Sequence, residues 1–135
     1  MAKIPSLALL YLILSVIFFT TSVAHSRDFK LRKRAGNLIV EMKIDRNPPI
    51  VDKNQITLKI KDVDGRNITD AKVIVNYYMP PMPGMPPMNY KTAAQLHGSE
   101  YRTVMDLIMA GPWNIVVKIL RTGKTSSVVF SIDVR

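Results

Sequence analysis

The chain has 135 residues, of which 19 are lysine or arginine and 10 are aspartate or glutamate, so its formal net charge is +9. It contains no cysteine, which excludes disulfides, thiolate metal sites and thiol nucleophiles. This length fits a single domain with a modest core. A basic excess can indicate nucleic-acid binding, but no recognition-helix pattern and no aromatic-interleaved basic strand accompanies it, so we expect no nucleic-acid partner.

Residues 1–24 have the organisation of a targeting segment. A lysine precedes an apolar run from Ile4 to Phe19, and the chain then turns small and polar, which is the order of regions in a secretory signal. Residues 4–23 also reach about the 20 residues that span a bilayer. Two interpretations stay open, a signal peptide cleaved near Ala24 and a retained membrane anchor. Both predict an extracytoplasmic location, periplasmic or secreted.

Basic residues gather in the next segment, 25–36, which is predicted to be a linker. Five positive charges fall within eight residues there, next to a single acid. A basic cluster beside an apolar segment suits contact with anionic lipid headgroups. We therefore expect the membrane surface as a partner, through Arg27, Lys30, Arg32, Lys33 and Arg34.

From residue 37 onward, apolar residues recur at every second position in short runs separated by turn residues, which is typical of an all-β domain. A run from Tyr90 to Leu96 is predicted to be a short edge strand. The inward sets of the other strands are, in chain order, Leu38, Val40, Met42 and Ile44; Ile56, Leu58 and Ile60; Ala71, Val73, Val75 and Tyr77; Tyr101, Thr103, Met105 and Leu107; Trp113, Ile115, Val117 and Ile119; and Val128, Phe130, Ile132 and Val134.

About seven short strands, one central tryptophan and no helical period predict an immunoglobulin-like β-sandwich over residues 37–135. The absence of a cysteine pair excludes an antibody-type domain. The apolar residues at the inward positions are numerous enough to close a core without disulfides.

Residues 79–88 interrupt this pattern with the sequence Met-Pro-Pro-Met-Pro-Gly-Met-Pro-Pro-Met. Proline cannot continue a central strand, so a long loop at one end of the sandwich is predicted. The four methionines, Met79, Met82, Met85 and Met88, are three residues apart, which is the repeat of a polyproline II helix. Gly84 permits a bend that would fold the two halves of the segment toward each other.

The methionine set has two interpretations. Thioether sulfur is a soft ligand that suits Cu(I), so converging methionines would form a site with little affinity for hard ions. A flexible methionine surface also serves as a contact site for another protein, or packs back on Tyr77, Tyr78 and Tyr90. Partner contact and Cu(I) binding both stay open at this point.

Two histidines are additional candidate ligands. His97 lies in a Gly-Ser turn and would join the methionines if that turn shares their end of the sandwich, although an ordinary exposed turn histidine is the simpler interpretation. His25 becomes a candidate only if cleavage after Ala24 makes it the N-terminal residue, because its amine and imidazole would then suit Cu(II) together.

Several landmarks follow one another in a characteristic order. They are Asp64-Gly65, Ala71, Val73, Met79-Pro80-Pro81-Met82, Gly98, Tyr101, Gly111-Pro112-Trp113 and the alternation from Val128 to Val134. This order resembles the YtkA-like family of small extracytoplasmic domains, related in layout to the periplasmic part of FixH-type proteins, and covers residues 37–135. The resemblance implies an immunoglobulin-like sandwich behind a signal or anchor, often associated with heavy-metal handling or respiratory-oxidase assembly, and brings no catalytic residues.

No catalytic motif is present, because no nucleophile elbow, zinc-binding helix pair or phosphate loop surrounds the serine, histidine and aspartate residues. We therefore expect no enzyme. The expected function is an extracytoplasmic module that handles a soft metal, most concretely Cu(I), through thioether ligands. The alternative is a metal-free module that presents the Met/Pro loop to an envelope or membrane protein, for example one of a respiratory complex.

Overall fold

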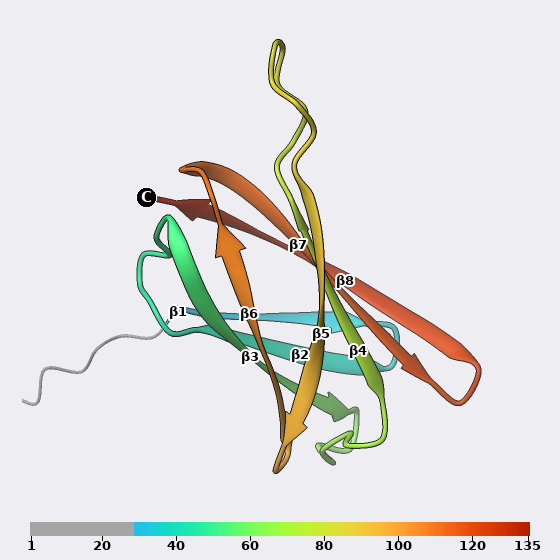
Figure 1. The fold of residues 1–135 in the computed structure, drawn as a ribbon. Coiled ribbons are helices and arrows are strands. Elements are labelled where there is room, and N and C mark those ends of the chain that lie inside the picture. Colours follow the sequence, from blue (N-terminus) through green and yellow to red (C-terminus); the bar gives the residue numbers. More distant parts are fainter. Residues whose placement is uncertain (1–28) are drawn as a thin grey trace, which may run out of the picture.

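The computed structural model describes residues 29–135, which form eight antiparallel strands (Figure 1). No helix in this range is long and apolar enough to cross a membrane. The predicted targeting segment lies outside the described residues. The strands are β1 (Phe29–Ala35), β2 (Leu38–Ile44), β3 (Asp52–Asp62), β4 (Lys72–Tyr78), β5 (Asn89–His97), β6 (Glu100–Leu107), β7 (Gly111–Arg121) and β8 (Lys124–Val134).

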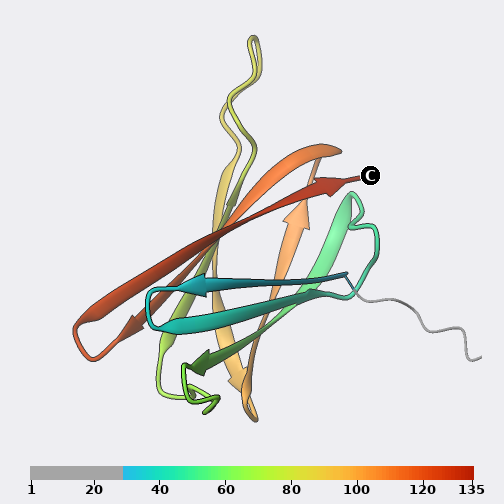
Figure 2. The same cartoon turned by 180° about the vertical axis from the view of Figure 1, so that it is seen from behind.

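The strands form one sheet in the order β1-β2-β3-β6-β5-β4-β7-β8. The sheet curls until β1 lies beside β8, so it forms a nearly closed barrel (Figures 1 and 2). β5 makes the corner of this barrel, because residues 89–94 pair with β4 and residues 95–97 pair with β6. The predicted strand at residues 90–96 is confirmed, but it is not the edge of the sheet, because β5 pairs with β4 along one part of its length and with β6 along the other.

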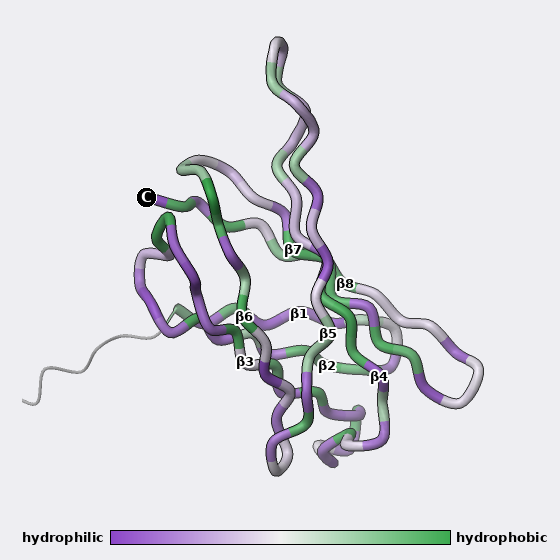
Figure 3. Tube along the Cα trace, in the orientation of Figure 1, coloured by the Kyte–Doolittle hydropathy of each residue, from purple (hydrophilic) through white to green (hydrophobic). Residues whose placement is uncertain are grey.

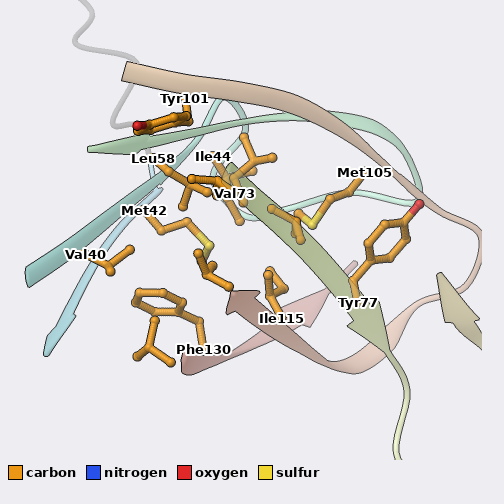
Figure 4. Packing of buried hydrophobic residues seen from close by; sticks show 14 of the residues in the cluster. Val40, Met42, Ile44, Leu58, Val73, Tyr77, Tyr101, Met105, Ile115 and Phe130 are labelled. Carbon is orange, nitrogen blue, oxygen red and sulfur yellow. The ribbon is translucent and has the colours of Figure 1, made fainter. Parts of the chain in front are cut away.

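The core is formed by the apolar residues at alternate positions of the strands, which point inward. Every predicted inward residue of β2, β3, β7 and β8 is buried, and so are three of the four predicted in β6. The exception is Thr103, whose hydroxyl hydrogen-bonds that of Thr92 across 2.7 Å. Figure 4 shows Met42 of β2 and Phe130 of β8 in the same core. Full burial of such side chains stabilises the fold by about 1.5–3 kcal/mol each.

β1 is the strand that the sequence pattern did not reveal, because residues 25–36 were expected to form a linker and about seven strands were expected in total. Four of its seven residues are cationic, and Figure 3 draws much of β1 in the hydrophilic colour. Its apolar residues Phe29 and Leu31 nevertheless pack against the core, and Ala35 is buried in it. An edge strand tolerates this density of charge because one of its sides faces solvent.

The two ends of the barrel carry different connections. At the upper end in Figure 1, residues 79–88 project beyond the ends of β4 and β5. The turn between β5 and β6 lies at the lower end. The rigid strands thus place the Met/Pro segment at one end of the molecule, where a connecting loop is free to carry function.

Candidate functional site

Residues 79–88 form a hairpin, which we call the methionine hairpin. At its base the amide of Met79 donates a hydrogen bond to the carbonyl of Met88 across 3.2 Å. At its tip the amide of Met85 donates to the carbonyl of Met82, also across 3.2 Å. The four prolines between base and tip lack the N–H that a strand ladder needs. The hairpin is therefore fixed at its two ends while its middle has no ladder (Figure 1).

Gly84 reverses the chain at the tip. Its φ is +77°, and it follows Pro83 inside the four-residue turn that the Met85 amide closes. Proline followed by a residue with positive φ is the pattern of a type II turn. The predicted bend at Gly84 is confirmed. Nothing lies within 4 Å of the place where a Cβ would stand, so glycine is favoured here by the backbone conformation alone.

The four methionines divide into two pairs by burial. Met79 is 6% exposed and belongs to the core, and Met88 is partly buried against it. Met82 and Met85 are 37% and 38% exposed. We call the first pair the base methionines and the second pair the tip methionines. A Cβ added at Gly111 would lie 3.1 Å from the Cε of Met79, so β7 presents a bare backbone to that side chain.

All four methionines border one hollow of about 240 Å³. Prolines supply most of the remaining lining, and no carboxylate or imidazole belongs to it. A space shared by four thioether side chains is what a common soft ion requires. The residues around the hollow are Tyr78, Met79, Pro80, Pro81, Met82, Met85, Pro86, Pro87, Met88 and Asn89.

An aromatic cluster supports the base of the hairpin. Tyr77 stacks on Tyr90 with ring centroids 5.4 Å apart, and the ring of Trp113 lies 6.0 Å from Tyr77 and 6.3 Å from Tyr90. The Trp113 indole donates to the carbonyl of Met109 across 2.9 Å. The Asn76 amide donates to the carbonyl of Tyr90 across 2.8 Å. These contacts hold both arms of the hairpin on a rigid base.

His97 does not lie near the methionines. It is exposed at the end of β5, opposite Glu100 in the turn to β6. Eight residue steps separate it from Asn89 at the foot of the hairpin, which is about 27 Å at the usual rise of a strand. His97 and the methionines therefore cannot bind the same ion. Within residues 29–135, no group of three or more histidine, aspartate or glutamate side chains could hold a metal, and His25 lies outside that range.

A family model described as YtkA-like matches residues 34–118, which is more than half of the 135-residue chain. The chain belongs to the YtkA-like family. The matched range of this YtkA-like domain runs from the end of β1 into β7 and contains the whole methionine hairpin. No curated protein and no solved structure matches the chain.

Gly111 and Asn76 belong to the site although the sequence pattern did not connect them with it. In the sequence, Gly111 precedes Pro112 and Trp113 and looks like an ordinary turn glycine. In the structure its φ is +121°, and its lack of a side chain leaves room for Met79. Asn76 is partly buried on β4, and its side chain hydrogen-bonds to Tyr90 and Asn89 on β5. Only strand pairing brings these residues together, so no local motif could have shown it.

Proposed function

We propose that this YtkA-like domain is an extracytoplasmic binding module that holds Cu(I) at the methionine hairpin. The observation that carries the proposal is the single hollow bordered by all four methionines. Thioethers favour Cu(I) or Ag(I) over hard ions, and the lining offers no competing carboxylate. The role is binding and not catalysis.

The two pairs of methionines have different parts in this proposal. The tip methionines are exposed and flexible, so they can turn their sulfur atoms toward an incoming ion at little cost. Met88, which is partly buried, supplies a third ligand from the base. Met79 is packed in the core beside Gly111, so its main role is to anchor the hairpin.

The proposal is tested by titrating the full chain with Cu(I) in competition with a chelator. In the double variant Met82→Leu/Met85→Leu, apolar bulk stays while two sulfur atoms are removed. We expect its Cu(I) affinity to fall by at least about tenfold, which corresponds to about 1.4 kcal/mol. Repeating the titration with Ag(I) should give the same order of affinities.

The matched control is Met42→Leu/Met105→Leu, which removes two thioethers from the core. Exchange of Met for Leu nearly conserves volume and usually costs less than about 1.5 kcal/mol per site. The control should bind Cu(I) as the unmodified chain does. Equal affinity of the hairpin variant and the unmodified chain would contradict the proposal.

A second candidate function is a metal-free module that presents the hairpin to an envelope or membrane protein. It is favoured by three exposed apolar side chains at this end, Met82, Met85 and Tyr90, which are 37%, 38% and 36% exposed. Exposed apolar surface on a rigid base suits a contact site. Leucine at both tip positions should then preserve partner capture, while aspartate should abolish it. Capture by the aspartate variant would exclude the hairpin as the contact.

We also propose that the barrel-like sheet is a variant of the immunoglobulin-like sandwich. The order β2-β3-β6-β5 followed by β4-β7-β8 corresponds to the A-B-E-D and C-F-G sheets of a constant-type domain. In this interpretation β5 joins the two sheets, and β1 is an added strand. The methionine hairpin then connects strands C and D at one end of the sandwich.

A further inference from the structure

One side of the barrel carries a concentration of positive charge. Along β1, β2, β3 and β6 the residues between the core positions point outward, and many of them are cationic. We call this surface the basic face. Arg102 contributes to it from β6, and the other cations are Lys30, Arg32, Arg34, Lys43, Lys59 and Lys61. Lys53 of β3 also points outward and lies opposite Asp106 of β6.

Strand register brings these side chains together in three rows. Lys30 lies opposite Lys43 in the first row. Arg32, Glu41 and Lys59 form the second row, and Arg34, Ile39 and Lys61 form the third. Neighbouring strands are about 4.8 Å apart and alternate residues about 6.8 Å apart, so the rows cover about 14 Å by 14 Å over four strands.

Carboxylates only partly offset this charge. Glu41 lies inside the second row, Glu100 is 3.5 Å from Arg102 and 4.0 Å from Lys59, and Asp45 lies at the margin beside Gln55. The charges of Lys53 and Asp106 cancel, and the other seven cations against three carboxylates leave a net +4 on this face. Like charges gathered on one face of a sheet oppose folding. A partner that carries negative charge would reduce this repulsion.

We propose that the basic face lies against an anionic phospholipid bilayer. Lysine and arginine stems are long enough to reach a layer of headgroups, and a cluster of them is attracted to anionic lipid. In the sequence, the predicted signal or anchor segment, residues 4–23, ends five residues before β1 begins, so the covalent chain keeps this face near any bilayer that holds that segment. The outward residues of these strands include no aromatic side chain on which a nucleic-acid base could stack.

The structure changes which residues of the basic cluster take part. Lys33 lies opposite the core residue Val40, and its amine donates to the carbonyl of Val129 across 2.8 Å. Lys33 therefore faces the junction of β1 and β8 and not the basic face. The methionine hairpin leaves from β4 and β5, so this proposal does not depend on metal binding.

The test uses the full chain reconstituted into vesicles, without metal, and measures how fast an amine-reactive reagent labels each lysine. One set of vesicles contains phosphatidylcholine alone, and the other contains phosphatidylcholine mixed with the anionic lipid phosphatidylglycerol, which attracts basic side chains. We expect Lys30, Lys59 and Lys61 to be labelled severalfold more slowly on the anionic vesicles. High salt should restore their labelling because it screens the attraction. Lys91, Lys118 and Lys124, on β5, β7 and β8, should be labelled equally on both.

Two variants with the same change in charge separate the basic face from the net charge. One is Lys30→Gln/Arg32→Gln/Lys61→Gln, and the other is Lys91→Gln/Lys118→Gln/Lys124→Gln. Each replaces two exposed residues and one half-buried residue. Because each basic contact contributes about fivefold to membrane attraction, three losses should lower the ratio of docked to undocked chains by about a hundredfold.

Lys59 remains in both variants and reports the docked state. It should lose its protection in the first variant and keep it in the second. Equal protection of Lys59 in both variants would overturn the proposal. So would protection on neutral vesicles, or protection that requires an added acidic protein, since each would identify a contact other than anionic lipid.

Discussion

At the scale of single residues, Met79 determines how the hairpin is joined to the barrel. Its side chain is 6% exposed, and its terminal methyl lies against the bare α-carbon of Gly111. The other three methionines of the hairpin are more exposed. The same residue type therefore serves packing at one position and presents thioether at the tip, and burial separates the two uses.

Replacement of Met79 by alanine should lower the free energy of unfolding by about 2–3 kcal/mol, because buried thioether is lost and a cavity remains at the end of the core. Met82→Ala is the matched control and should change stability by less than about 0.5 kcal/mol, since its side chain lies at the exposed tip. Denaturant unfolding measures both values. Equal stability of the two variants would show that Met79 is not a core residue.

At the scale of elements, the hairpin is held by its base and by the turn at Gly84. Its four arm prolines reduce the freedom of the chain before any ligand arrives, which lowers the cost of ordering the loop. The turn decides whether the two tip methionines face one space. A change in the turn should therefore affect binding without affecting the core.

Gly84→Ala should weaken Cu(I) binding by about fivefold, because alanine at this positive φ costs about 1 kcal/mol and favours an open turn. Gly65→Ala is the matched control, since Gly65 has a φ of +82° and open space around its α-carbon as well. That variant should bind Cu(I) normally. Chelator competition measures both affinities, and unchanged binding by the Gly84 variant would mean that the tip turn does not organise the ligands.

Local sequence rules predicted the elements of the core and the bend of the hairpin. Alternation marks β2, β3, β7 and β8 because each has one buried and one solvated face. The alternation rule did not reveal β1, because four of its seven residues are cationic and its stability comes from pairing with β2. The division into base and tip methionines depends on Gly111, which lies in β7 and contacts Met79 only in the folded chain. The distance between His97 and the methionines depends on the length of β5 and on the strands with which β5 pairs.

At the scale of the whole molecule, the barrel closes without a complete ladder of backbone hydrogen bonds between β1 and β8. β1 and β8 are the two ends of the strand order, and they meet side by side in the fold (Figure 2). The side chain of Lys33 on β1 contacts β8 across this junction. Its amine donates a hydrogen bond to the Val129 carbonyl and lies 5.9 Å from the centre of the Phe130 ring. A lysine at an inward position of an edge strand thus connects the two ends of the sheet.

Lys33→Met keeps the apolar stem of the side chain and removes its charge and its donor. We expect β1 to open more readily, with amide hydrogen exchange in β1 about fivefold faster, because the lost hydrogen bond and cation–π contact are together worth about 1 kcal/mol at this exposed site. Lys30→Met is the matched control on the outward side of the same strand. It changes a side chain that points away from the junction with β8, so it should leave exchange unchanged. Faster exchange in both variants would mean that charge on β1, and not the contact with β8, holds the barrel closed.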